Sequence, residues 1–171
     1  MAERRRDPST PRGSPADAPP EPEAAELLRR SVQRFVRSFG LLATSATPCG
    51  APLPLSHAHA QMFLLARSGD ATPPTQQALG EALGIDKSNV ARLCGKMERQ
   101  GHITQIRSPT DGRARLLALT TRGRRAARET DEASRQRFAR VLAAVPAELR
   151  DSLLVSLEAL NAAIIAVGSQ T

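Results

Sequence analysis

Three polar side chains near the middle of the chain have the types and spacing to read the edges of DNA base pairs. Ser88, Asn89 and Arg92 lie close together in a segment with helical periodicity. An Asn side chain can pair with adenine through two hydrogen bonds and an Arg side chain with guanine, each discriminating against the wrong base by about 1–3 kcal/mol. The apolar residues of the segment fall at positions i, i+3, i+4 and i+7: Val90, Leu93, Cys94 and Met97. We therefore predict a helix that buries its apolar face and leaves the polar face free to contact DNA.

Positive charge is concentrated around the same segment. The 171-residue chain has 24 Lys and Arg residues against 17 Asp and Glu residues, a net charge of +7. Residues 87–128 hold eleven of the basic residues but only Glu98 and Asp111 as acids. A polyanion is the natural partner of such a field, although charge alone fits a solvated face without a partner equally well. Four of these cations are expected to contact phosphates, which sets affinity without reading sequence: Lys87, Lys96, Arg107 and Arg115.

Residues 76–92 fit a helix-turn-helix. Small Gly80 is expected where the two helices cross closely, and Gly84 is expected in the turn, where a left-handed backbone is least costly for glycine. The hydrophobic period then shortens to that of a β-hairpin, with strands over 103–107 and 115–119. Together these elements predict a winged helix-turn-helix, in which the second helix enters the major groove and the hairpin follows the DNA backbone.

Helical periodicity extends to both sides of this lobe. Residues able to cap helices precede three of the expected elements: Ser56, Thr75 and Asp86. A further helix is expected to begin at Thr120 or Thr121. The first helix is expected to reach about Ala46, the second to end near Gly69, and a long Arg-rich helix to reach Val145. A last helix begins at Ala147, after Pro146, and its apolar surface is more than a small domain can cover. This excess predicts an intermolecular helical interface.

The expected fold class is mainly α with a small β-hairpin wing (α+β). The expected divisions are a disordered Pro- and Arg-rich tail over 1–22, a helix over 23–48, the winged lobe over 55–122 and further helices over 123–168.

The run DGRARLLALT, from Asp111 to Thr120, resembles the wing signature of MarR-family transcriptional regulators. The upstream run KSNVARLCGKMERQGHI is similar to that family's recognition helix and first wing strand. The resemblance extends in element order from about residue 24 to residue 168. It implies an obligate homodimer with a winged helix-turn-helix in each protomer and with dimerisation helices over 23–48 and 123–168, acting as a repressor or, less often, as an activator. The excess of Arg over Lys, 22 to 2, is typical of a GC-rich bacterial genome.

The resemblance also implies roles for individual residues. Arg113 is at the wing tip, where a guanidinium can enter a narrow minor groove. Asp111 can hold a nearby Arg in position, or it can cap its own turn. A small anionic or phenolic effector is implied in a cleft beside the dimerisation helices, and the residues that could line it also fit a plain core: Phe35, Phe39, His57, Gln61 and Met62.

Redox and metal chemistry are less well supported. Some members of the family sense oxidants through a cysteine in the first helix, whereas Cys49 lies beyond that helix and Cys94 is expected on a buried face. Cys49 is thus the one redox candidate. His57 and His59 are two residues apart, so on a helix they point to different faces and cannot chelate one ion. His102 is expected at the surface or facing a phosphate. We expect no metal and no cofactor.

The sequence therefore predicts a sequence-specific, dimeric DNA-binding regulator that a small ligand releases from a pseudo-palindromic operator. The alternatives are a thiol-based redox regulator and an architectural protein that binds double-stranded DNA without sequence preference. An enzyme is not expected, because no catalytic residues, phosphate-cradling loop or paired carboxylates are found. A cytoplasmic location is expected, because no signal peptide or membrane-spanning stretch is recognised.

Overall fold

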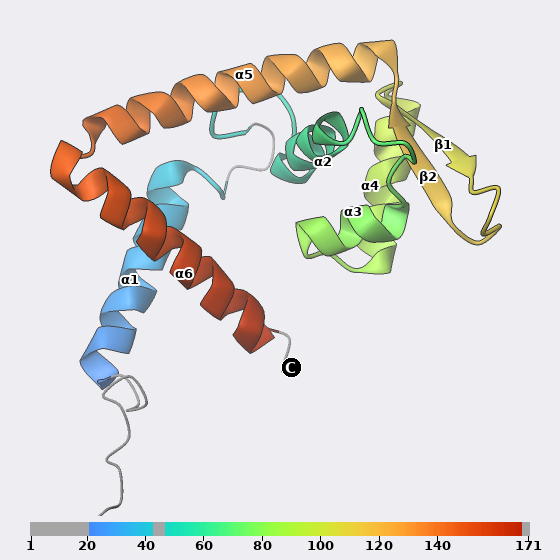
Figure 1. Ribbon diagram of the computed structural model, residues 1–171. Helices are drawn as coiled ribbons and strands as arrows, with labels where there is room; N and C mark the ends of the chain where they lie inside the picture. Colours follow the sequence, from blue (N-terminus) through green and yellow to red (C-terminus); the bar gives the residue numbers. More distant parts are fainter. Residues whose placement is uncertain (1–20, 43–46, 169–171) are drawn as a thin grey trace, which may run out of the picture. The chain divides into compact units, whose positions relative to one another are not determined.

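The computed structural model describes residues 21–42 and 47–168 (Figure 1). They fall into two units, one ending at Phe39 and the other beginning at Gly40. The predicted tail lies outside the described residues, except for its last two positions. The fold class is as predicted: helices and one two-stranded antiparallel sheet.

The first unit contributes helix α1 (Pro22–Phe39), and none of its residues is buried within that unit. Phe35 and Phe39 stack on one another, with ring centroids 5.2 Å apart. The prediction that this helix reaches Ala46 is wrong, because Gly40 has a φ of 81° and an α-helix cannot continue through a left-handed residue.

The second unit contains five further α-helices and the hairpin. Their bounds are α2 (Leu55–Ala66), α3 (Gln76–Leu83), α4 (Lys87–Arg99), β1 (Ile103–Arg107), β2 (Arg115–Leu119), α5 (Thr121–Ala144), the 3-10 turn η2 (Ala147–Leu149) and α6 (Arg150–Gly168). In the hairpin, Ile103 pairs with Leu119 and Arg107 with Arg115. The core lies between α2, α3, α4, the hairpin and the start of α5, and its largest members are Leu79, Met97, Ile103 and Leu117.

The bounds of α2 differ from the prediction. Ser56 does not cap it; the helix begins at Leu55, and the carbonyl oxygen of Pro54 accepts hydrogen bonds from the N–H groups of His57 and Ala58. The fixed φ of proline already suits a helix start, so no side-chain cap is needed. The helix ends at Ala66 rather than near Gly69, since Arg67 leaves helical geometry.

The helix-turn-helix forms as its residues predict. Thr75 Oγ1 accepts from the N–H of Ala78 and begins α3, while Gly84 ends α3 with a φ of 62°. A Cβ atom on Gly80 would lie 3.2 Å from the carbonyl oxygen of Ile85, so the close crossing is confirmed. The carboxylate of Asp86 caps α4.

Helix α5 is joined tightly to the turn between α4 and β1. The N–H of Thr120 donates to the carbonyl oxygen of His102 at 3.0 Å, and its hydroxyl donates to that of Gly101 at 2.6 Å. A side chain on Gly123 would overlap the same carbonyl group of His102. Only glycine therefore lets the first turn of α5 approach the turn this closely.

The last helix leaves most of its apolar side chains exposed within its unit. The predicted start at Ala147 falls in η2, and Arg150 donates to the carbonyl oxygens of Val145 and Ala143 across the corner at Pro146. Ile165, Val155 and Val167 are each about two-thirds exposed or more (71%, 68% and 68%). Residues 147–168 are the one helical stretch of the described chain long and apolar enough to span a membrane, by length and composition alone.

Candidate nucleic-acid interface

The outward face of α4 presents the predicted polar residues together. All five side chains expected there are exposed: Lys87, Ser88, Asn89, Arg92 and Lys96. Asp86, at the start of the helix, accepts hydrogen bonds from the hydroxyl and N–H of Ser88 and from Asn89. Together these bonds lower the pKa of Asp86 to about 2, and the bond from the Ser88 hydroxyl has the largest effect. The carboxylate is thus ionised, and its hydrogen bonds stabilise the first turn of the helix.

The turn at the wing tip is held by its own polar groups. The hydroxyl of Ser108 accepts from the N–H groups of Thr110 and Asp111 at 3.3 and 3.2 Å. Asp111 Oδ1 accepts from the backbone N–H of Arg113 at 2.9 Å, whereas no ion pair between Asp111 and an Arg side chain forms within the described residues. Of the two roles considered for Asp111, the structure shows the turn cap. The guanidinium of Arg113 is left exposed.

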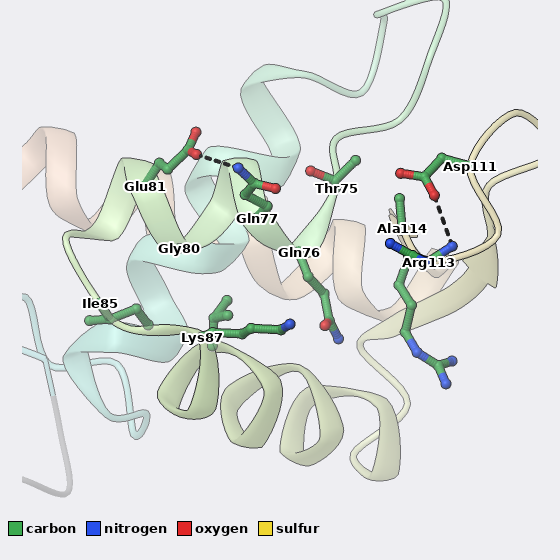
Figure 2. Close-up of a pocket in the computed structure, with 12 residues that line it drawn as sticks. Thr75, Gln76, Gln77, Gly80, Glu81, Ile85, Lys87, Asp111, Arg113 and Ala114 are labelled. Atoms are coloured by element: carbon green, nitrogen blue, oxygen red, sulfur yellow. Dashed lines mark hydrogen bonds between the residues drawn. The ribbon is translucent and has the colours of Figure 1, made fainter.

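A cleft of about 540 Å³ separates the two helices from the wing. Figure 2 shows Gln76 and Lys87 lying between α3, α4 and the hairpin. The lining includes three cations, one from α4 and two from the wing: Lys87, Arg113 and Arg115. Its acids are Asp111, which caps the wing turn, and Glu81, which accepts from Gln77. Three cations against two acids give the cleft a net positive charge, which favours contact with a DNA backbone.

A chain of side-chain hydrogen bonds fixes the wing relative to both helices. Gln76 on α3 donates to Gln105 on β1, and Gln105 donates to Glu98 on α4 at 2.8 Å. The backbone N–H of Gln105 also donates to Glu98 at 3.2 Å. The sequence analysis missed these residues, because the three partners come from different elements. The sequence signal that could have revealed this contact was the polar residue Gln105, which alternates with the buried Ile103 along β1.

His102 is not where the sequence analysis placed it. It is buried, with 8% of its surface exposed, and its Nδ1 atom lies 3.0 Å from Nε2 of the fully buried His57. The close attachment of α5 to the turn after α4 directs His102 inward, toward α2. Burial, with His102 and Lys96 nearby, lowers the pKa of His57 to about 4; burial and Arg122 lower the pKa of His102. Both rings are neutral at neutral pH, and His102 is turned into the interior against His57 instead of toward the surface.

The predicted effector-lining residues are divided between the two units. Phe35 and Phe39 belong to the first unit, whereas His57, Gln61 and Met62 lie on α2 in the second. Gln61 is fully buried, and neither its amide nitrogen nor its amide oxygen has a hydrogen-bond partner in the described part of the protein. The cleft itself stays a prediction.

The two cysteines have different surroundings. Cys94 is fully buried on α4, and burial followed by the charge of Glu98 raises the pKa of its thiol to about 11. Cys49 is partly exposed and shares a hydrogen bond of 2.9 Å with the hydroxyl of Thr47. No group of three His, Cys, Asp or Glu side chains within the described ranges could hold a metal ion.

Comparison with known proteins agrees with this geometry. Residues 52–114 match the sequence model of the MarR family, while no curated protein matches the chain. The PcaV transcriptional regulator from Streptomyces coelicolor superposes with a TM-score of 0.61 at 23% identity, covering 84% of this chain and 98% of PcaV. The MepR–DNA complex of S. aureus gives 0.60 at 15% identity over 83% of this chain and 93% of MepR. A probable transcriptional regulator from Pseudomonas aeruginosa gives 0.59 at 24% identity, over 81% and 97%. Residues 52–114 thus match the sequence model of the MarR family, and the chain is similar in fold to these winged-helix transcriptional regulators.

Proposed function

We propose that the protein is a dimeric, sequence-specific DNA-binding transcriptional regulator, a repressor that a small ligand releases from a pseudo-palindromic operator. The observation that carries this proposal is the exposed polar first turn of α4 beside a cation-lined cleft and a basic wing. A recognition surface and a backbone-binding surface on one small lobe are what reading a DNA duplex requires.

Each part of this surface has a proposed task. Ser88, Asn89 and Arg92 face the base edges in the major groove, and Arg113 enters the minor groove beside it, with Asp111 fixing its turn. The remaining cations contact phosphates: Lys87, Lys96, Arg107 and Arg115. All four are exposed, and no ion pair within the described residues neutralises them.

Dimerisation is proposed through the terminal helices, residues 23–48 and 123–168. Helices α1 and α6 each expose apolar side chains within their own units, among them Leu27 at 66% and Ile165 at 71%. Covering such faces contributes about 25 cal/mol for each Å² of apolar surface removed from water. A second copy of the chain supplies the same faces and orients two recognition helices about a two-fold axis.

The proposed effector is a small anionic or phenolic compound bound near Phe35, Phe39, His57, Gln61 and Met62. The unpartnered amide of Gln61 supports a polar ligand or water there, because buried amides are nearly always hydrogen-bonded. One solved structure of PcaV, similar in fold, is described as a complex with its natural ligand. A cytoplasmic location accompanies the proposal, since the operator is genomic DNA.

The proposal is tested by selecting bound duplexes from a random pool with the purified protein at two salt concentrations. Enrichment of a pseudo-palindrome with half-sites roughly 10 bp apart supports it. Binding that falls steeply with salt and enriches no sequence would instead identify an architectural DNA-binding protein.

A further inference from the structure

A network of hydrogen bonds at the start of α4 fixes the amide of Asn89. One oxygen of the Asp86 carboxylate, Oδ1, accepts from the N–H and hydroxyl of Ser88 at 2.8 and 2.7 Å and from the N–H of Asn89 at 2.9 Å. The other oxygen, Oδ2, accepts from Nδ2 of Asn89. Since Asp86 is held by backbone groups, the plane of the Asn89 amide is held as well.

The oxygen of this amide in turn contacts Arg92. Nη2 of Arg92 donates to Oδ1 of Asn89 at 2.9 Å, and Nε lies 3.5 Å from the carbonyl oxygen of Ser88. The two contacts fix the guanidinium along its Nε–Nη2 edge. They leave both N–H groups of Nη1 and the second N–H of Nη2 free to donate elsewhere.

The network suits the two side chains to different tasks. An Asn side chain reads adenine with its oxygen and nitrogen together, and in Asn89 both atoms are bonded within the helix. An Arg side chain reads guanine with two parallel N–H groups, and Arg92 retains them. We propose that Asn89 is a positioning residue, which holds the guanidinium of Arg92 for guanine readout instead of reading adenine itself. This inference rests on the proposed function.

Both side chains can be changed without disturbing the core. Asn89 and Arg92 are exposed. In an Asn89→Ala variant, Asp86 keeps its bonds to Ser88 and to the backbone N–H of residue 89, so the cap of α4 remains. Ser68→Ala is the control, because exposed Ser68 also donates a local side-chain hydrogen bond, to the carbonyl oxygen of Leu65 at 2.8 Å, and lies outside the proposed DNA contacts and dimerisation helices.

The experiment selects DNA sites from a random pool with the wild-type protein, N89A, R92A, the double variant N89A/R92A and S68A. We expect R92A to lose the preference for one guanine in each half-site. N89A is expected to weaken the preference for that same guanine by about threefold to tenfold, a part of the discrimination that a good bidentate pair supplies. The double variant should match R92A, because the two residues act through one contact. S68A should select the wild-type site.

The possible outcomes are distinguishable. Loss of an adenine preference in N89A at a position that R92A leaves intact would show that Asn89 reads DNA directly, and would overturn the inference alone. An N89A profile equal to the wild-type profile would also overturn it alone. If the wild-type protein enriches no site, both the regulator function and this inference are wrong.

Discussion

Nε2 of His57 and Nδ1 of His102 lie 3.0 Å apart in the interior of the second unit, and this contact joins α2 to the turn between the recognition helix and the wing. The His102 carbonyl accepts from Thr120, so the same residue also fixes the start of α5. Two side chains that are 45 residues apart in sequence thus connect α2 to the turn between α4 and β1.

Stability is expected to depend on pH through this pair. The pKa of His57 is about 4 in the folded protein and about 6.5 when unfolded, so the unfolded chain binds more protons between these values. The contribution of neutral His57 is complete above pH 6.5 and is lost as the pH falls toward 4, by up to about 3 kcal/mol. Urea unfolding of the wild-type protein and of His57→Gln from pH 7 to pH 4 measures it. H57Q should show a smaller pH slope, whereas His59→Gln, which changes an exposed histidine of the same helix, should not. Equal slopes in all three proteins would contradict the assignment.

Gly123→Ala is expected to destabilise the protein by at least about 2 kcal/mol. The new methyl group would overlap the backbone carbonyl of His102, and backbone atoms cannot move aside as the end of a side chain can. Gly95→Ala is the matched control, because only Arg99 Nη1, at 3.5 Å, lies near the new methyl group and alanine favours a helix interior. Thermal unfolding should show a lower Tm for G123A and an equal or higher Tm for G95A. A G123A variant as stable as the wild type would mean that α5 does not approach the turn this closely.

Arg113→Glu is expected to weaken binding to the selected operator by at least about tenfold and to reduce its salt dependence, because the exposed guanidinium lies at the tip of the wing. Fluorescence anisotropy at several salt concentrations measures both effects. Arg67→Glu, at an exposed position after α2 that is assigned neither to DNA nor to the dimerisation helices, provides the charge-matched comparison and should bind normally. An operator affinity of R113E equal to that of the wild type would contradict the placement of Arg113 against DNA.

Only one thiol of the folded protein is expected to react with a maleimide at neutral pH. Cys94 is buried with a pKa of about 11, so it has little thiolate and no access, whereas Cys49 is partly exposed. Mass spectrometry should find one label per chain in the wild type, none in Cys49→Ser, and two in the unfolded wild type. The redox alternative is tested with the same variant: if C49S loses a peroxide response in DNA binding that the wild type shows, the protein is a thiol sensor.

The parts of the fold that sequence predicted well are those that neighbouring residues decide. Thr75, Gly84 and Asp86 act on backbone groups within three or four positions, and both strands of the hairpin have their predicted bounds, 103–107 and 115–119. Helix ends that depend on backbone φ, at Gly40 and Pro54, were misplaced.

The site shows the same division. The outward residues of α4 follow from its periodicity, but contacts between distant elements do not. The inward turn of His102 depends on how α5 packs, and the bond from Gln76 to Gln105 depends on where β1 lies against α3. The hydrogen bonds of Asn89 with Asp86 and Arg92 are local, yet its residue type alone suggested a contact with a base.

Because α5 is attached to the residues before β1, a small rotation at this attachment displaces the far end of the helix. At 1.5 Å per residue, the 24 residues of α5 extend about 36 Å from Thr121. A rotation of about 5° at the contact between Gly123 and His102 would displace the far end of the helix by about 3 Å. In the proposed dimer the far end lies with the interface, so the same small rotation changes the separation of two recognition helices by an amount comparable to the rise of a base pair.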